Sequence, residues 1–281
     1  MIHEHKYLVV EDGVELNLQI REIGASAWIV VTHGIGEHLE RHNYLLDLFA
    51  QNFNILHYDL RGHGRSLGER GNIEDFSVYM RDLREIITCL HRDYKMSRYC
   101  LYGHSMGALI TAGFMQHHVS ESCYPEKVFL SAPPIGLGGA MGQIVKYLPV
   151  EIFSGLAKIP FSVPLPDMVD LTLLSHDVRV TEAYIQDDFT LKKLHSKLLI
   201  ELVKTSKQVF SRPLNITCPV TCVVGGADEI VDLASIKNYF SSIDKSSRLK
   251  VVEGAYHEMH NEVGRYREPF IEIIKEFFTA P

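Results

Sequence analysis

The sequence of 281 residues lacks a long hydrophobic run, because no uninterrupted apolar stretch reaches the about 18 residues that a membrane-spanning helix needs. The first residues, Met1-Ile2-His3-Glu4-His5-Lys6, lack the apolar core of a signal peptide. Cysteine is scarce, and the five scattered residues are an odd number, which favours a reducing, intracellular compartment. We interpret all five as small core residues. These absences predict a cytoplasmic protein, with residence at a membrane surface left open.

The chain also lacks an excess of positive charge. Lys and Arg number 28 against 35 Asp and Glu, which gives a net charge of −7. Because a nucleic-acid-binding face needs clustered basic residues, this balance argues against nucleic acid as the main partner. Hydrophobic residues make up 46% of the chain, so it is able to bury the core of one large domain or of a domain with an insert.

Short β-rich segments recur along the chain and alternate with helical patterns. The first two flank Glu11-Asp12-Gly13, which is a hairpin signal. Later ones are apolar runs such as Trp28-Ile29-Val30-Val31, typical of strands buried on both faces of a parallel sheet. Apolar spacing predicts helices over residues 75–94 and 267–278, so we expect an α/β fold with an eight-stranded, mostly parallel sheet flanked by helices. The predicted strands are Lys6–Val10, Glu15–Glu22, Ala27–Thr32, Asn54–Tyr58, Arg98–Gly103, Glu126–Ser131, Pro219–Val224 and Arg248–Glu253.

The alternation breaks between about Ile135 and Ser206. Helical patterns occupy residues 141–148, 179–186 and 191–208, and no strand of the main sheet is evident. We interpret residues 135–206 as an inserted, mainly helical cap. Residues 1–134 and 207–281 then form the core. Two ordinary crossover helices joined by a long loop are the alternative.

A candidate nucleophile directly follows the predicted strand at residues 98–103. Gly103-His104-Ser105-Met106-Gly107 is a G-x-S-x-G pattern, and a predicted helix follows it. A serine in such a strand-to-helix turn has its hydroxyl exposed to a base, and the glycines let the two backbones pass closely. Chance alone produces the pattern in about one of ten chains of this length. An acid, a base and an oxyanion loop must therefore support it.

The order of the remaining groups fits a serine hydrolase. Asp228 and His257 each follow a predicted strand, at the same edge of the sheet as Ser105. The order Ser, Asp, His is that of the α/β-hydrolase triad. His257 would take the proton of Ser105, and Asp228 would orient the imidazole and stabilise its charged form. The rivals are His104, His63 and His260 for the base and Asp232, a predicted helix cap, for the acid.

The oxyanion formed in such a reaction needs at least two fixed donors. One candidate is the backbone N–H of Met106, at the start of the helix after Ser105. The other is the N–H of Ile35 in the glycine-rich stretch His33-Gly34-Ile35-Gly36, after another predicted strand. The glycines allow backbone directions that aim an N–H into a cavity. A plain strand-to-helix connection is the alternative.

Several stretches carry a resemblance to a known family. They are His33–His38, Asp59–Ser66, Gly103–Gly107, Gly226–Asp228, Tyr256–His260, Ser175–Asp177 and Tyr184–Asp187. Together they resemble the motifs of the monoacylglycerol lipases, an α/β-hydrolase family that also contains lysophospholipases. The similarity covers nearly the whole chain and is strongest outside the predicted cap. Two departures, Asp187-Asp188 in place of Asp-Pro and Ala108 in place of a second glycine, leave the candidate catalytic groups untouched.

The resemblance also implies an alcohol-binding set. Glu37, Arg41, Tyr184 and His260 match polar positions that hold a glycerol-like head in that family. The residues alone leave other interpretations open. Glu37 and Arg41, four apart, would form a surface ion pair on a helix. Tyr184 would belong to the core, and His260 would be a solvated loop residue.

No metal ion or cofactor is expected. His257-Glu258-Met259-His260 lacks the spacing of a zinc-binding H-E-x-x-H helix. Cys218 and Cys222 lie four apart on a predicted strand, which separates them by about 13 Å, too far to share an ion.

The predicted function is a cofactor-free serine esterase or lipase that hydrolyses monoacylglycerol-like acyl esters through an acyl-enzyme on Ser105. Its partner would be a small lipid or acyl ester. A lysophospholipase or another carboxylesterase of the same fold is the alternative enzyme, and a non-catalytic binding protein is the alternative class. The cap residues predicted to line an acyl tunnel or to contact a membrane surface are Met141, Ile144, Val145, Leu148, Ile152 and Phe153.

Overall fold

The computed structural model describes residues 4–120, 123–166, 168–214, 216–243 and 247–280. Eight strands form one sheet in the order β1-β2-β4-β3-β5-β6-β9-β10. β2 is antiparallel to both of its neighbours, and the pairs from β4 to β10 are parallel. The predicted eight-stranded, mostly parallel sheet is thereby confirmed. The strands are β1 Glu4–Val9, β2 Glu15–Arg21, β3 Trp28–Thr32, β4 Asn54–Tyr58, β5 Tyr99–His104, β6 Lys127–Ser131, β9 Val220–Gly225 and β10 Ser247–Val252.

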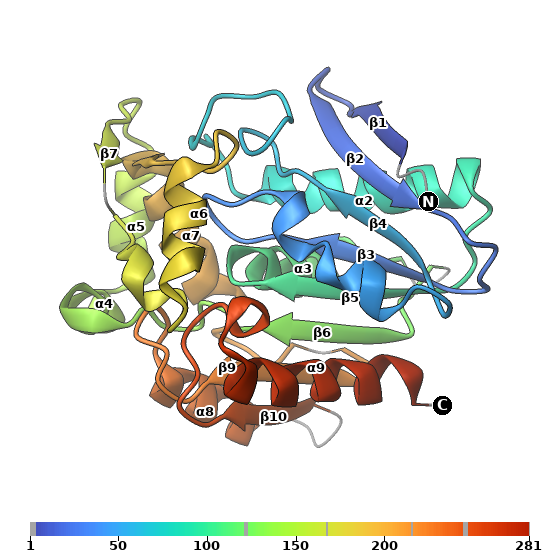
Figure 1. The fold of residues 1–281 in the computed structure, drawn as a ribbon. Helices are drawn as coiled ribbons and strands as arrows, with labels where there is room; N and C mark the ends of the chain where they lie inside the picture. Colours follow the sequence, from blue (N-terminus) through green and yellow to red (C-terminus); the bar gives the residue numbers. More distant parts are fainter. Residues whose placement is uncertain (1–3, 121–122, 167, 215, 244–246, 281) are drawn as a thin grey trace.

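Helices cover both faces of the sheet. The main ones are α1 Tyr44–Leu48, α2 Ser77–Asp93, α3 Met106–His117, α8 Leu233–Ser242 and α9 Gly264–Thr279, with short 3₁₀ turns η1 Leu39–His42 and η3 Met259–Asn261. In Figure 1, α1 and α9 lie in front of the sheet, and α2 and α3 lie behind it. The ring of Phe278 in α9 meets that of Phe49 edge-on at 5.5 Å, so the two front helices share one core. Met80, Leu83 and Leu90 form part of the buried face of α2, as their spacing predicts.

The chain between β6 and β9 adds no strand to the main sheet in the residues that the structure describes, as predicted. It forms α4 Gly139–Tyr147, α5 Val150–Leu156, β7 Pro164–Pro166, η2 Leu171–Leu173, α6 Val178–Gln186, β8 Lys193–His195 and α7 Ser196–Val209. β7 and β8 pair with each other, so the helix predicted from residue 191 begins only at Ser196. α7 packs on both α5 and α3. The proposed cap boundaries of 135 and 206 stay a prediction.

None of the helices in the described part of the chain combines the length and the apolar character needed to cross a membrane.

Two glycines allow α3 to approach the sheet closely. A Cβ atom at Gly107 would lie 2.2 Å from the carbonyl oxygen of Thr32 in β3. A Cβ atom at Gly103 would lie 2.5 Å from the carbonyl oxygen of Gly107. Neither distance leaves room for a side chain. The close passage predicted for the two ends of the G-x-S-x-G pattern is therefore confirmed.

We expect Gly107→Ala to lower the free energy of unfolding by about 1–3 kcal/mol, because the added methyl group overlaps the Thr32 carbonyl and α3 must shift. Gly155→Ala is the matched control, since nothing lies within 4 Å of a Cβ atom placed at Gly155 in α5. Alanine there should raise stability by about 0.5–1 kcal/mol, as it does inside helices generally. Urea unfolding followed by circular dichroism measures both changes. Equal unfolding midpoints for the two variants would contradict the close approach.

Candidate active site

The predicted site segments lie at one edge of the sheet. Ser105 follows β5, Asp228 follows β9, His257 follows β10 and Ile35 follows β3. These strands are parallel, so their carboxyl ends meet at the same edge. α5, α6 and α7 lie on the side to which β5 and β6 point (Figure 1). The site therefore lies between the sheet and the chain between β6 and β9, which we call the inserted segment.

Ser105 occupies a strained turn between β5 and α3. Its backbone is left-handed, with φ 51° and ψ −120°. A non-glycine residue holds such a conformation only when its surroundings enforce it. Here the N–H of Ser105 donates to the carbonyl of Ser131 in β6 at 2.8 Å. This is the geometry expected of a nucleophile elbow.

His257 lies between the two other predicted triad residues. Its Nε2 is 3.0 Å from Oγ of Ser105, and its Nδ1 is 2.7 Å from Oδ2 of Asp228. Because a carboxylate only accepts hydrogen bonds, Nδ1 carries the proton and Nε2 presents its lone pair to the serine hydroxyl. The other oxygen of Asp228 accepts the N–H groups of Ile230 and Val231 at 2.8 and 3.0 Å, which fixes the carboxylate.

The rival residues have other partners. Asp232 accepts a backbone N–H of α8 at 3.1 Å, which confirms its prediction as a helix cap. Nδ1 of His104 lies 3.2 Å from a serine hydroxyl of β6, and Nδ1 of His63 lies 3.1 Å from a backbone carbonyl. Of the histidines that the structure describes, His257 is the one whose ring is hydrogen-bonded to Ser105.

The pKa values of the buried histidines near the site differ. Burial lowers the pKa of His33 to about 4 and that of His63 to about 3, and it holds the pKa of His104 well below its usual range. Burial also opposes the charged form of His257. There the charge and hydrogen bond of Asp228, helped by two further carboxylates, outweigh it, so the pKa of His257 lies above its usual value. His257 is therefore the one of these four that is suited to carry a proton.

The two predicted oxyanion donors belong to segments next to Ser105. Met106 is the first residue of α3, and Ile35 lines the cavity at the turn that Gly36 makes with φ +75°. Within the described residues, no hydrogen bond from the N–H of Ile35 or Met106 is recorded. Both N–H groups remain available to a developing oxyanion. Their role there stays a prediction.

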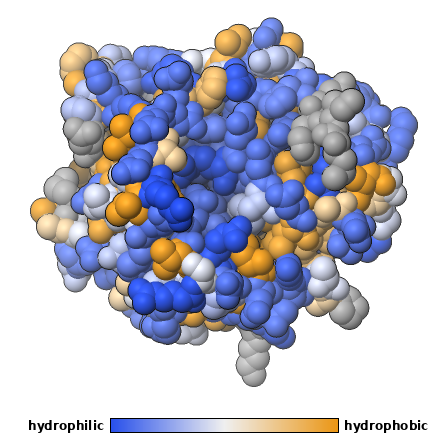
Figure 2. Space-filling view, viewed as in Figure 1, coloured by the Kyte–Doolittle hydropathy of each residue, from blue (hydrophilic) through white to orange (hydrophobic). Residues whose placement is uncertain are grey.

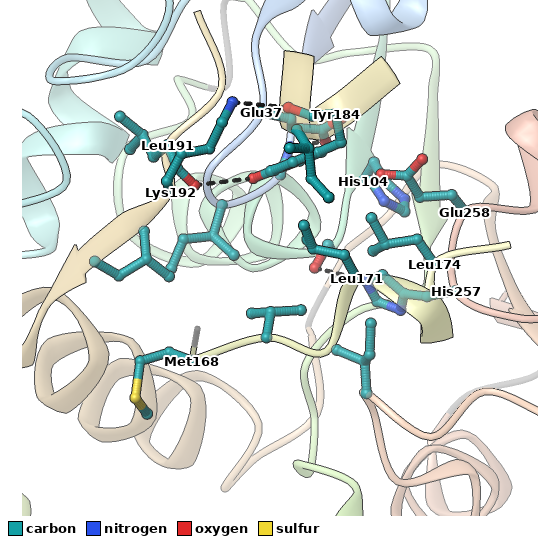
Figure 3. Close-up of a pocket in the computed structure, with 17 residues that line it drawn as sticks. Glu37, His104, Met168, Leu171, Leu174, Tyr184, Leu191, Lys192, His257 and Glu258 are labelled. Carbon is teal, nitrogen blue, oxygen red and sulfur yellow. Dashed lines mark hydrogen bonds between the residues drawn. The ribbon is translucent and has the colours of Figure 1, made fainter. Parts of the chain in front are cut away.

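A cavity of about 370 Å³ opens at Ser105 and His257. Its walls are mainly apolar: Leu171 and Leu174 lie beside His257, and Leu191 lies across the space (Figure 3). These wall residues come from 3₁₀ and loop segments without a periodic pattern, so sequence analysis missed them. Five residues predicted for an acyl tunnel do not line the cavity, because they lie further out on α4 and α5; they are Ile144, Val145, Leu148, Ile152 and Phe153. The side chain of Met141 lies outside the described part of the structure.

The four residues of the expected alcohol-binding set separate into two pairs. Glu37 and Tyr184 line the cavity, whereas Arg41 and His260 are not among its lining residues. Arg41 lies 3.4 Å from Glu37 and also bonds Glu258, so the ion pair is buried and its interpretation as a surface pair is wrong. His260 is buried beside His42, with 4.7 Å between ring centres, so its interpretation as a solvated residue is also wrong.

One buried cluster consists of residue types that bind metal ions. Atoms of Glu37, His42 and His260 lie within 4.8 Å of one another. Glu37 already accepts hydrogen bonds from His42 and from the N–H of Gly34. The guanidinium of Arg41 lies next to the second oxygen and would repel a cation. Glu37, His42 and Arg41 therefore fit an internal polar network better than a metal site. The ring nitrogens of His260 make no hydrogen bond in this network.

The fold and the site together define a serine hydrolase of the α/β-hydrolase fold. They combine a nucleophile elbow with a histidine that a carboxylate orients, both at the carboxyl ends of the strands of a mostly parallel sheet. The chain belongs to the serine aminopeptidase S33 family, whose model matches residues 24–264. It is 27% identical over 237 residues to a monoacylglycerol lipase of Mycolicibacterium smegmatis, covering 83% of this chain and 82% of that protein.

Two further comparisons agree with this assignment. The chain is 25% identical over 243 residues to the phospholipase YtpA of Bacillus subtilis, covering 85% of this chain and 90% of that protein. It matches the crystal structure of a Paleococcus ferrophilus monoacylglycerol lipase with a TM-score of 0.81 and 25% identity, over 93% of this chain and 97% of the other. The resemblance predicted from the motifs is thereby confirmed.

Activity should be lost on the acid side, because protonated His257 is unable to accept the serine proton. The apparent pKa of this loss in kcat/KM should lie above the ordinary histidine value of about 6.5. Asp228→Asn removes the charge that raises the pKa, so the acid limb should move to lower pH while the rate falls by about 10⁴-fold. Asp232→Asn is the control, because asparagine still caps α8 and the acid limb should stay in place. An unmoved acid limb in Asp228→Asn would refute the pairing.

Proposed function

We propose that the chain hydrolyses monoacylglycerol-like esters through an acyl-enzyme on Ser105. The observation that carries the proposal is the hydrogen-bonded series Ser105, His257 and Asp228 beside a mainly apolar cavity. Relatives named monoacylglycerol lipases support the substrate class. This chain covers 82% of the length of the Mycolicibacterium smegmatis relative.

In the proposed acylation step, Oγ of Ser105 attacks the acyl carbon while Nε2 of His257 takes the hydroxyl proton. Asp228 holds the imidazole in the required tautomer and stabilises its positive charge. The carbonyl electron pair moves onto oxygen, where the N–H groups of Ile35 and Met106 stabilise it. Collapse of this intermediate breaks the bond to the alcohol oxygen. His257 returns its proton to that oxygen, and the alcohol leaves.

Deacylation repeats the same proton transfers with water. Nε2 of His257 takes a proton as the water oxygen attacks the acyl carbon. The bond to Oγ of Ser105 then breaks, and His257 gives the proton to Oγ. The free acid leaves, and the enzyme returns to its starting state without a cofactor.

The cavity supports a substrate with one acyl chain. Its volume of about 370 Å³ lies near the lower end of the range of about 300–1,000 Å³ for small-ligand sites. Burial of each chain methylene against the apolar wall contributes about 0.8 kcal/mol. Longer chains should therefore bind more tightly until the cavity is full.

The charges around the cavity favour an uncharged alcohol head over a phosphate. Glu37 and Glu258 are lining residues, and each places a carboxylate near the site. Lys192 is the one Lys or Arg among the described lining residues. Its ammonium already donates to the carbonyls of Tyr184 and Asp187, at 2.7 and 2.6 Å. A phosphate would have to displace one of these acceptors to receive a hydrogen bond from the ammonium.

Ser105→Ala should reduce hydrolysis of a medium-chain monoacylglycerol by about 10⁶-fold, since the variant has no nucleophile. A fluorophosphonate probe should label the wild-type protein and leave this variant unlabelled. Hydrolysis by the variant at the wild-type rate, measured as fatty acid released, would refute the role of Ser105.

A head-group panel tests the substrate class independently. A monoacylglycerol, the matching lysophosphatidylcholine and an aminoacyl amide would be compared at equal enzyme concentration. We expect the monoacylglycerol to have the highest kcat/KM. A preference for lysophosphatidylcholine would instead support the lysophospholipase alternative, and a preference for the amide would support a peptidase.

We also propose that the outer face of the inserted segment contacts a lipid surface. Ile144 and Tyr147, three apart on α4, are 60% and 80% exposed. Apolar side chains interrupt the hydrophilic surface on the side of the molecule where α4 to α6 lie (Figure 2). A substrate drawn from a membrane would reach the cavity from this side. The cytoplasmic location expected from the sequence stays a prediction.

Replacing Ile144 and Tyr147 by serine should reduce co-sedimentation with phosphatidylcholine vesicles by about tenfold or more, given about 1.5–3 kcal/mol for each large apolar side chain buried in lipid. Hydrolysis of a short-chain soluble ester should be unchanged. The matched control replaces Tyr7 and Val9, two exposed apolar residues of β1, by serine. Equal losses in both double variants, or none in either, would contradict this contact.

A further inference from the structure

The loop Gly34–Gly36, which we call the oxyanion loop, is held by side chains on both sides. It leaves β3, and Gly36 takes the left-handed conformation. A Cβ atom at Gly34 would lie 2.7 Å from Oε1 of Glu37 and 3.1 Å from Cβ of Ser105. A Cβ atom at Gly36 would lie 2.4 Å from the hydroxyl of Tyr184. Both side chains therefore pack directly against the loop, with no room for a further atom between them.

Glu37 holds the start of the oxyanion loop. Its Oε1 accepts the N–H of Gly34. The carboxylate is buried. Its Oε1 lies 3.1 Å from Nε2 of His42, and its Oε2 lies 3.4 Å from Nε of Arg41. Burial opposes its charge, but His42 and Arg41 help to hold the pKa of Glu37 well below its usual range. A buried, ionised acceptor whose neighbours fix it in this way is a rigid support for one backbone amide.

Tyr184 holds the end of the oxyanion loop. Its hydroxyl donates to the carbonyl of Gly36 at 2.7 Å, and the N–H of Leu191 donates to the same carbonyl at 2.7 Å. The single hydroxyl proton of Tyr184 is therefore used by the backbone. Figure 3 shows Tyr184, Glu37 and Leu191 gathered at one end of the cavity, away from His257.

A third contact fixes the middle of the oxyanion loop. Nε2 of His33 accepts the N–H of Leu60 at 2.9 Å, so Nδ1 carries the proton and donates to the carbonyl of Gly34 at 2.8 Å. The amide of Gly34 and the carbonyls of Gly34 and Gly36 are thus all bonded. The N–H of Ile35 lies between these fixed points.

We infer that Glu37 and Tyr184 are positioning residues that hold the oxyanion loop for acyl transfer. The inference rests on the proposed function. Tyr184 gives its hydroxyl proton to the loop, and Glu37 gives it one oxygen, Oε1, whereas Oε2 of Glu37 has no hydrogen-bond partner among the described residues. Loss of either contact lets the N–H of Ile35 drift, and a shift of about 1 Å in a catalytic group costs about 10²-fold in rate.

Positioning of the oxyanion loop and binding of the alcohol head have different effects on deacylation. By that step the alcohol has left, so a residue that only binds the alcohol head has no further effect. The oxyanion forms again in deacylation, so a residue that positions the donors still matters. Deacylation is thus the readout that separates the two roles.

The experiment compares wild type, Tyr184→Phe, Glu37→Gln and Glu37→Ala on a monoacylglycerol and on the methyl ester of the same acid. Single-turnover deacylation is measured after a burst with the p-nitrophenyl ester, and fluorophosphonate titration counts folded sites. Tyr184→Phe and Glu37→Ala should lower kcat on both esters by equal factors, about 10- to 100-fold, and should slow deacylation. KM should change little. Glu37→Gln keeps an acceptor for Gly34 and should recover part of the rate.

Tyr239→Phe is the matched control, because Tyr239 also donates to a backbone carbonyl, that of Arg212 at 2.9 Å, but does not line the cavity. Its rates should equal those of the wild type. A loss confined to the monoacylglycerol with normal deacylation would overturn the inference in favour of head-group binding, and unchanged rates on both esters would overturn it as well. If the wild type hydrolyses neither ester, the proposed function fails instead.

Discussion

The approach of α3 to the end of β3 is the constraint on which the site depends. Gly107 brings the first turn of α3 against the carbonyls of Thr32 and His33, with no space for a side chain between them. This contact brings the first turn of α3, which begins at Met106, next to the end of β3 and the loop that follows it. The left-handed backbone of Ser105 is its consequence, because the chain must reverse between β5 and α3 within one residue. The resulting strain is of the order of 1–3 kcal/mol and must be offset by packing elsewhere.

A second constraint is electrostatic and decides which histidine is able to act as the base. His104 and His257 lie 5.1 Å apart between ring centres, and both are buried. Burial in a low-dielectric interior disfavours the imidazolium in each. Only His257 has a carboxylate, Asp228, at hydrogen-bond distance from its Nδ1. The choice between two similar side chains therefore depends on one ion pair and not on exposure.

The sequence predicts the sheet and the residues at its strand ends well, because these depend on local signals. An apolar run such as residues 28–31 needs no knowledge of its neighbours to be recognised as a buried strand. The placement of Ser105, Asp228 and His257 follows from strand ends at one sheet edge. The surroundings of Glu37 do not follow, since its partners His42 and Arg41 gain their burial from distant segments. One wall of the cavity comes from residues 168–174, which lack periodicity and acquire their positions only by packing.

The hydrogen bonds of the inserted segment also limit which of its parts are able to move or to be substituted. Tyr184 and Leu191 both bond the carbonyl of Gly36, and His38 bonds Asp187 at 2.7 Å. Residues 184–191 are thereby hydrogen-bonded to the segment of residues 36–38 near Ser105. Moving this part away would leave the Gly36 carbonyl without both donors, at a cost of about 1–3 kcal/mol if it stays buried. The opposite wall is tied to the site as well, because the carbonyls of Leu173 and Leu174 accept the N–H groups of His257 and Glu258 at 3.5 and 2.8 Å. Acyl-chain preference is therefore free to change through the side chains of this wall where these backbone hydrogen bonds are kept.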